Sequence, residues 1–175
     1  MDMNHTRSYL HLDIKPSNIH LRAGSEPMLL DFGAVHQFSG DRKRKSGQVV
    51  TAGYSPVEQY YQGGYVGPWS DVYAIGASMR ACIEGKTPPT AIERHANDTL
   101  VPASTAFCDQ YPLYLLECMD WAMELDPLQR PQNAGELLVA DFGAQTVGGS
   151  SGGGGVGRGR DPRRGPRTPG APRPS

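Results

Sequence analysis

The chain has 175 residues, enough for one domain and a tail, and its net charge of −1 hides an uneven distribution. Residues 149–175 contain six Arg and one Asp, which leaves 11 basic and 17 acidic residues, a net charge of −6, in residues 1–148. An acidic body argues against a core that binds nucleic acid. No apolar run approaches the ~18 residues that a membrane span needs, and the N-terminus lacks the basic-then-apolar pattern of a secretory signal.

The first predicted element is a small β-hairpin. Residues 18–22 (NIHLR) alternate in polarity, residues 27–32 (PMLLDF) form a short apolar run, and the Gly-containing segment between them is a turn signal. Residues 36–50 are polar and basic, which predicts a loop. Its run Arg42–Lys45 either docks an acidic partner or is solvated loop charge.

A central helix is predicted from Ser70 to Gly85. Ser70 is the expected N-cap, Asp71 lies favourably near the positive end of the helix dipole, and Gly85 is the expected C-terminal stop. The face expected to be buried carries five apolar residues, Val72, Ile75, Met79, Cys82 and Ile83.

Two more helices are predicted towards the C-terminus. One covers residues 112–125, and Pro127 follows it as a breaker; its expected inward residues are Leu115, Leu116, Met119 and Met123. The other begins at Asn133, where Glu136 completes an approximate capping box, and runs to about Ala140.

The composition changes abruptly near the C-terminus. From Gly148 onward the chain is rich in Gly, Arg and Pro, has no aromatic residue and has a single large apolar residue, Val156. Such a segment buries too little surface to offset the entropy of ordering. We therefore expect one mainly α domain over residues 1–142, with a small β-hairpin at its start, and a disordered tail over residues 143–175. The tail is either a linker, a read-through or frame-shifted segment, or a weak RNA-binding segment.

The three cysteines, Cys82, Cys108 and Cys118, are odd in number and far apart. They match neither a disulfide framework nor a zinc site. We expect buried or half-buried free thiols in a cytoplasmic protein.

A cluster of chemically useful side chains stands near the start of the chain, in the segment HLDIKPSN. Asp13 can accept a hydrogen bond from a hydroxyl group, Lys15 can stabilise a phosphoryl group, and Asn18 can offer an oxygen to Mg²⁺. Asp31, followed by Phe32 and Gly33, is a second candidate metal ligand, on a bend that the Gly permits. Alone, the D-x-K-x-x-N pattern is weak and also fits a capped turn.

These two segments, with 18 residues from Asp13 to Asp31, resemble the catalytic loop and the metal-binding loop of eukaryotic-type (Hanks-type) serine/threonine protein kinases of the bacterial branch. The resemblance implies the C-lobe of an α+β kinase fold. It also implies ATP and Mg²⁺ as cofactors, a protein substrate, Asp13 and Lys15 as catalytic residues, Lys15, Asn18 and Asp31 as cofactor-binding residues, and Asn18 and Asp31 as metal ligands. A second DFGA, at Asp141–Ala144, has no catalytic loop upstream at that distance and is expected to be chance.

Three further positions extend the resemblance. The segment TAGYSPVEQ (51–59) is similar to the end of a kinase activation segment, in which Thr51 is expected near the catalytic Asp and Lys. Asp71 looks like the buried Asp that opens the central helix of the large lobe, and Arg130 looks like the Arg that pairs with the activation-segment glutamate, here Glu58. Lys15 and Thr51 favour serine/threonine over tyrosine specificity.

The sequence also departs from the family pattern. Leu12 replaces the usual Arg before the catalytic Asp, which makes switching by an activation-loop phosphate less expected, although Ser46 and Thr51 stay candidate phosphosites. His11 is expected to pack rather than shuttle protons. Only twelve residues precede Asp13, so the family's small lobe, which contacts the ATP phosphates, is not in this sequence. We expect that lobe to be the natural packing partner, and little phosphotransfer from this chain alone. The alternatives are a non-catalytic, pseudokinase-like binding module and an adaptor that acts through the Arg/Gly tail.

Overall fold

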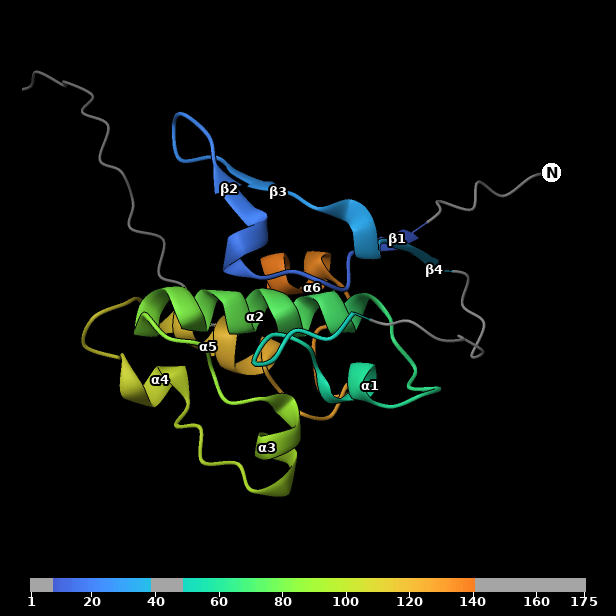
Figure 1. Cartoon of the computed structure of the whole chain (residues 1–175). Coiled ribbons are helices and arrows are strands. Elements are labelled where there is room, and N and C mark those ends of the chain that lie inside the picture. Colours follow the sequence, from blue (N-terminus) through green and yellow to red (C-terminus); the bar gives the residue numbers. More distant parts are fainter. Residues whose placement is uncertain (1–7, 39–48, 141–175) are drawn as a thin grey trace, which may run out of the picture. The chain divides into compact units, whose positions relative to one another are not determined.

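The structure, a computed structural model, describes residues 8–38 and 49–140 (Figure 1). It is mostly helical, with two small antiparallel sheets. The predicted tail, the run Arg42–Lys45, Ser46 and the second DFGA all lie outside the described residues. No helix in the described part of the chain is both long and apolar enough to cross a membrane.

The predicted hairpin is present and is formed by β2 (Ile19–Leu21) and β3 (Pro27–Leu29), with Ile19 opposite Leu29. Short 3-10 helices flank it, η1 (Pro16–Asn18) before β2 and η2 (Phe32–Ala34) after β3. The hairpin is therefore shorter than predicted at both ends, because Asn18 and Phe32 belong to these turns. Pro16 at the start of η1 has the fixed φ that favours a tight helical turn.

The prediction of a loop over residues 36–50 is wrong at its start. β4 (His36–Phe38) pairs antiparallel with β1 (Ser8–Leu10), so that Tyr9 lies opposite Gln37. Neither strand was predicted, because three residues are too few for an alternating pattern to be detected. The pairing joins the chain just before the segment HLDIKPSN (11–18) to the chain just after the Asp31–Gly33 bend.

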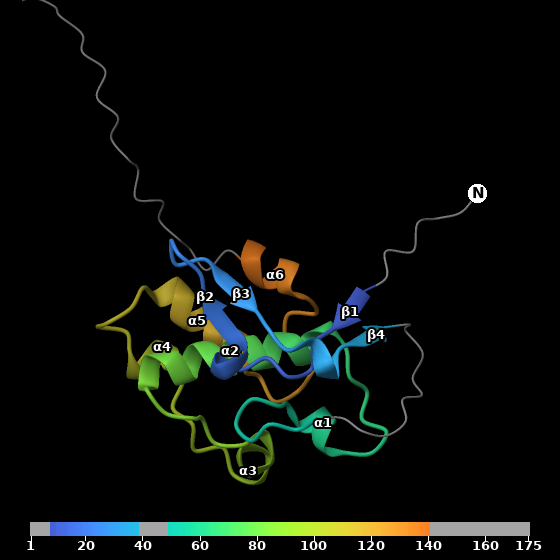
Figure 2. The same ribbon diagram turned by 45° about the horizontal axis from the view of Figure 1, so that its top comes forward.

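α2 (Pro68–Glu84) is the central helix of the described region. The β2–β3 hairpin lies on one side of it, and α1 (Val57–Tyr60) and α3 (Ala91–Ala96) lie on the other (Figures 1 and 2). The helices α5 (Leu113–Ala122) and α6 (Ala134–Val139) pack on α2, and α4 (Ala103–Ala106) packs on α5.

Both ends of α2 have identifiable causes, and the predicted N-cap is wrong. The helix begins at Pro68 with Gly67 as N-cap, so Ser70 is the third helical residue, and its Oγ accepts a hydrogen bond from Gly67 N–H at 3.2 Å. Pro is well suited to the first helical position because its missing N–H would be unpaired there anyway. The predicted stop at Gly85 is present, with a left-handed φ of 69°.

The predicted apolar side of α2 is only partly buried, although Met79 and Ile83 pack against a core cluster. Val72 is buried, but Ile75, Met79 and Ile83 are only half-buried and Cys82 is exposed. The residues that face the core are mostly small, namely Val72, Tyr73, Ala74, Gly76, Ala77 and Ala81. A Cβ atom on Gly76 would lie 2.8 Å from Ala122 Cβ and 2.9 Å from Met123 Cγ, so α5 approaches too closely there for a larger residue.

The two C-terminal helices agree better with prediction. In and just after α5, Leu116, Met119 and Met123 are buried as expected, whereas Leu115 is half-buried. α6 begins after Asn133, whose side chain accepts a hydrogen bond from Glu136 N–H at 3.0 Å, so the predicted cap is present. The free-thiol prediction holds, but Cys82 and Cys108 are exposed rather than buried, and only Cys118 is half-buried.

Candidate functional site

The segments HLDIKPSN (11–18) and TAGYSPVEQ (51–59) meet at Asp13. Thr51 donates its hydroxyl hydrogen to Asp13 Oδ1 at 2.6 Å. Lys15 Nζ lies 3.0 Å from the same oxygen, 2.9 Å from Asp13 Oδ2 and 3.3 Å from Thr51 Oγ1. The three side chains thus form a closed triangle of polar contacts.

Asn18 completes this cluster from η1. Its side-chain Nδ2 donates to the backbone oxygen of Asp13 at 2.8 Å and to Asp13 Oδ2 at 3.1 Å. Both amide hydrogens are therefore directed at Asp13, and the side-chain oxygen of Asn18 has no hydrogen-bond partner among the described residues. That leaves one hard oxygen free to hold a cation.

The environment keeps Asp13 ionised. Burial alone would raise the pKa of the Asp13 carboxyl, but the hydrogen bonds from Thr51, Lys15 and Asn18 and the charge of Lys15 together lower this pKa below its ordinary value. Asp13 is consequently a carboxylate at neutral pH. In this form it can accept a hydrogen bond from a hydroxyl group and orient it.

The β2–β3 hairpin places Asp31 next to Asn18. Leu30 N–H donates to the backbone oxygen of Asn18 at 2.7 Å, continuing the pairing of Ile19 with Leu29. Asp31 follows directly, with a left-handed φ of 57°, and its side chain accepts a hydrogen bond from Gly33 N–H at 3.2 Å. A non-glycine residue in this conformation is uncommon, and such strain concentrates at functional sites.

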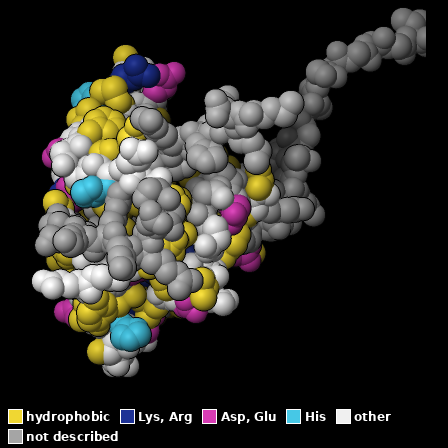
Figure 3. Space-filling model, turned by 90° about the vertical axis from the view of Figure 1, so that its right-hand side faces the viewer, with side chains coloured by type: hydrophobic (Ala, Val, Ile, Leu, Met, Phe, Trp, Pro, Cys, Tyr) yellow, Lys and Arg dark blue, Asp and Glu magenta, His cyan; other side chains and the backbone are white. Residues whose placement is uncertain are grey.

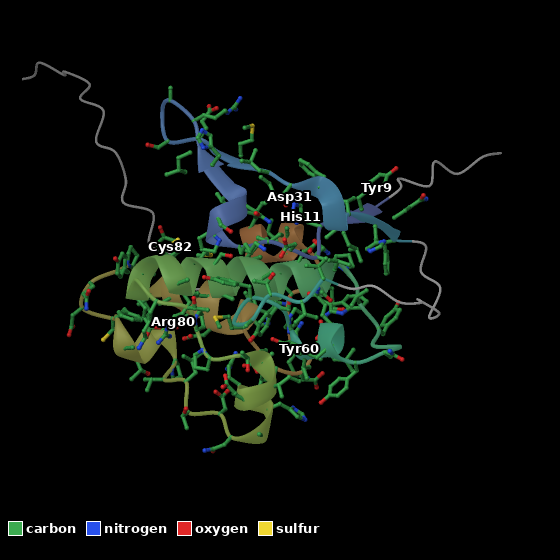
Figure 4. All side chains as sticks on the ribbon, viewed as in Figure 1. Tyr9, His11, Asp31, Tyr60, Arg80 and Cys82 are labelled. Atoms are coloured by element: carbon green, nitrogen blue, oxygen red, sulfur yellow. The ribbon has the colours of Figure 1, made fainter. Side chains whose placement is uncertain are left out.

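His11 lies near Asp31, as Figure 4 shows, and it contacts residues that follow β3. Asp13 N–H donates to His11 Nδ1 at 3.3 Å, so the ring proton belongs on Nε2, which lies 3.1 Å from the backbone oxygen of Leu30. The ring also packs edge-on against Phe32, with centroids 5.4 Å apart. His11 is buried and holds the two loops together, as the packing role predicted for it requires.

Asp71 anchors the backbone of the catalytic loop from α2. Its two carboxylate oxygens accept hydrogen bonds from His11 N–H and Leu12 N–H, both at 2.8 Å. Burial raises the pKa of Asp71, although these two backbone hydrogen bonds oppose the rise. Leu12 has a positive φ of 61°, and its buried side chain packs with Leu10 and Val66. Asp71 therefore holds a strained backbone turn directly before Asp13.

The ion pair predicted between Glu58 and Arg130 is present and is bidentate. Arg130 Nη1 lies 2.8 Å from Glu58 Oε1, and Nη2 lies 3.1 Å from Oε2. Ser70 also donates to Glu58 at 2.8 Å, Arg130 donates to backbone oxygens of the segment after α5, and its guanidinium lies over the Tyr73 ring. The pair is buried, so it ties the end of the activation segment to the helical core.

Sequence reasoning missed the contribution of Gln59. Its Nε2 donates to the backbone oxygen of Leu12 at 2.9 Å and to that of Val49 at 3.1 Å, so it bridges the catalytic loop and the activation segment. Gln59 was visible only as the last letter of the SPVEQ motif, and no spacing rule singles out a side chain that bonds backbone atoms 47 residues away.

The donor set fits a magnesium ion better than a softer metal. Asn18 and Asp31 offer oxygen atoms, and Mg²⁺ is usually held by one or two protein oxygens together with phosphate oxygens and water. In the described part of the chain no three His, Cys, Asp or Glu side chains cluster with metal-binding geometry. A site built from protein ligands alone is therefore not indicated in that part.

The cluster around Asp13, the β2–β3 hairpin, the bend at Asp31 and the buried Glu58–Arg130 pair are brought together in one part of the fold. The chain belongs to the protein kinase domain family, which matches residues 1–143, and within it to the Hanks-type serine/threonine kinases of bacteria.

Among the proteins that the chain resembles are serine/threonine kinases of mycobacteria. The chain is 29% identical over 154 residues to the serine/threonine-protein kinase PknD of Mycobacterium tuberculosis, covering 84% of this chain and 23% of PknD. It is 30% identical over 136 residues to PknL of the same organism, covering 74% of this chain and 34% of PknL. A solved structure described as "PpkA-294 apo form" has 34% sequence identity and a TM-score of 0.61, over 74% of this chain and 45% of that one. The chain thus spans less than half the length of each of these proteins.

Proposed function

We propose that this chain is the C-lobe of a serine/threonine protein kinase, which transfers the terminal phosphoryl group of ATP to Ser or Thr hydroxyls of proteins. The observation that carries the proposal is the closed set of contacts among Asp13, Lys15, Asn18 and Thr51, beside the strained bend at Asp31. Phosphoryl transfer needs little covalent chemistry from the protein, and such a set supplies positioning and charge.

Each side chain has a distinct role in this proposal. Asp13, ionised, accepts the hydrogen bond of the substrate hydroxyl and aims its oxygen. Lys15 lies within 3.0 Å of Asp13 and brings a positive charge to the transferring phosphoryl group. Thr51 holds both residues in place. Asn18 and Asp31 hold Mg²⁺, which neutralises phosphate charge when it is bound.

The absence of an Arg at position 12 supports a kinase that does not depend on a phosphate in the activation segment. Leu12 is only 2% exposed and packs with Leu10, Val66 and Phe38, so this position is apolar where a phosphate-binding cation would otherwise lie. Thr51 is already bound to Asp13 and Lys15, and the segment is anchored by Gln59 and Glu58.

A second lobe is the natural partner of this one. Tyr9 and Phe32 are 61% and 65% exposed, and hydrophobic side chains reach the surface at several places on the described part of the face that Figure 3 shows. Exposed apolar surface of this kind favours a protein partner. We infer that a small lobe covers this surface and contributes most of the contacts to ATP.

The metal-binding roles can be tested with Mn²⁺ and ADP, without any need for turnover. Titration of the isotope-labelled chain should broaden the amide signals of Asn18 and Leu30 and of their neighbours, and Asp31→Asn should abolish the effect. Asp126→Asn, an exposed carboxylate beyond α5, is the matched control and should leave the broadening unchanged. Broadening that persists in Asp31→Asn, or that is lost equally in Asp126→Asn, would contradict the metal-binding role of Asp31.

Activity provides a second test. With Mg²⁺-ATP and a mixed Ser/Thr peptide, the chain alone should show little or no phosphotransfer, because the contacts of the small lobe are worth several kcal/mol. Robust phosphorylation that disappears in Asp13→Asn would contradict the inferred dependence on a small lobe while supporting the roles of the residues.

A further inference from the structure

A concave surface lies beside the cluster formed by Asp13, Lys15, Asn18 and Thr51. It is a cavity of about 340 Å³ lined by residues of three segments, Pro16, Tyr54, Ala81, Cys82, Gly85, Lys86 and Thr87. Pro16 directly follows the proposed catalytic Lys15, and Tyr54 N–H donates to the backbone oxygen of Thr51 at 3.1 Å. Two walls of the cavity therefore continue directly from residues that contact Asp13.

The third wall is the C-terminal end of α2 and the turn after it, which Cys82 marks in Figure 4. This turn is held closely against the activation segment. A Cβ atom on Gly53 would lie 2.4 Å from Thr87 Cγ2 and 2.7 Å from the backbone oxygen of Pro88, and Gly53 has a left-handed φ of 82°. The turn that carries Lys86 is thus packed on the segment that carries Thr51.

Lys86 is the only charged residue in the lining of this cavity. Its side chain is 71% exposed, and within residues 8–38 and 49–140 it has one ion pair, with Glu84, which is long at 3.9 Å. Glu84 is instead bound by Arg80 at 3.0 Å, and the hydrogen bond from Arg80 is the main reason that the pKa of Glu84 is lowered. The exposed end of Lys86 can therefore also meet a negative charge on a ligand, and no carboxylate is among the described residues that line the cavity.

From this charge distribution we propose that the cavity receives a side chain of the substrate close to the phosphoacceptor, and that it selects acidic over basic peptides through Lys86. The proposal rests on the kinase function and adds the class of substrate. A preference for acidic peptides would oppose the overall charge of residues 1–148. Their net charge of −6 would on its own attract basic peptides. A preference for acidic peptides would therefore have a local origin.

The test is an NMR titration of the isotope-labelled chain with three peptides of equal length. Each has a central Ser, and Glu, Gln or Lys residues flank it on both sides. We expect the acidic peptide to bind roughly 3-fold more tightly than the basic one at low salt, since an exposed charge pair contributes modestly. The shifts should include the amides of Tyr54, Lys86 and Thr87, and the preference should fade at about 1 M salt, where charges are screened.

Variants assign the effect to one side chain. Lys86→Gln should remove the preference, and Lys86→Glu should reverse it. Arg22→Glu is the matched control, because Arg22 is an exposed cation on the segment after β2 that pairs with Glu26, and it should leave the preference unchanged. An unchanged preference in Lys86→Glu, or acidic-peptide shifts confined to residues 42–45 or 149–175, would overturn the proposal.

Two outcomes separate this proposal from the kinase function. Peptides of every charge that shift the amides of Lys15 and Thr51 equally would remove the acidic preference and leave the kinase proposal standing. A complete absence of shifts at the catalytic cluster and at the cavity would contradict both.

Discussion

Thr51 and Asp13 are joined by a 2.6 Å hydrogen bond across 38 residues of chain. The hydroxyl of Thr51 belongs to the activation segment and the carboxylate of Asp13 to the catalytic loop. Because Lys15 contacts both, the bond reports whether the activation segment is seated against the proposed catalytic residues. It also has a measurable electrostatic effect.

Thr51→Ala should raise the pKa of Asp13, because the bond from Thr51 is the strongest of the influences that lower it. Since the folded-state pKa of Asp13 lies below its ordinary 3.8, its contribution to stability is present above about that pH and is lost as pH falls through the folded-state value. In Thr51→Ala this contribution should be smaller, and its loss should be complete at a higher pH. Carboxyl carbon NMR titration measures the pKa directly.

Thr51→Ser provides the control for this prediction. It retains the hydroxyl group and should keep the pKa of Asp13 close to that of the native chain. An equal rise in both variants would show that the threonine methyl group, and not the hydrogen bond, is responsible.

Removing one partner of the buried Glu58–Arg130 pair should be strongly destabilising. Arg130→Met leaves Glu58 buried without its cation, and such losses amount to about 3–5 kcal/mol in the free energy of unfolding. The double variant Glu58→Gln with Arg130→Met should lose less than the sum of the single changes. Urea denaturation measures each value. Arg22→Met, which breaks an exposed pair with Glu26, should change stability by less than about 1 kcal/mol.

Gly76→Ala should destabilise the protein, although the same change within a helix is ordinarily favourable by ~0.5–1 kcal/mol. The new methyl group would lie 2.8 Å from Ala122 Cβ, and overpacking of this kind costs about 1–3 kcal/mol. Thermal or urea unfolding provides the measurement. Cys82→Ala, on the exposed face of the same helix, should stay within about 0.5 kcal/mol of the native chain. A stabilised Gly76→Ala variant would mean that α5 does not pack this closely on α2.

Asp71→Asn should lose about 1–3 kcal/mol, because an amide has one acceptor oxygen whereas the carboxylate accepts from both His11 and Leu12. Asp126→Asn is the matched control, since Asp126 is exposed and accepts one backbone hydrogen bond from Leu128. Denaturation curves that move equally for the two variants would contradict the anchoring role of Asp71.

The sequence allowed the local chemistry to be predicted more reliably than the packing. The hairpin, the Gly85 stop, the Asn133 cap and the Glu58–Arg130 pair are all present, because each depends on a short motif or on a resemblance with fixed spacing. The depth of burial around α2 was predicted only in part, for a physical reason. Hydrophobicity favoured its large residues, whereas the closest helix contact requires small ones such as Gly76 and Ala77.

The resemblance correctly predicted that Thr51 lies near Asp13 and Lys15, but other contacts that shape the site were beyond prediction. Gln59 and His11 act on backbone oxygens, which any residue provides, so their partners leave no pattern in the sequence. The β1–β4 pairing likewise depends on two three-residue segments that have no signal of their own. Such contacts arise only from the tertiary fold.

The Asp71 anchor has a consequence for how the protein folds. The segment 8–38 contains Asp13, Lys15, Asn18 and Asp31, yet the hydrogen bonds that fix its backbone turn come from a helix about 60 residues away. Closing a loop of that length has an entropic cost that local contacts do not offset. We therefore expect this structure, whose contacts join residues far apart in the sequence, to form late in folding. An isolated peptide of residues 8–38 should therefore contain the reactive groups without their geometry, and the site should mature only when α2 has docked.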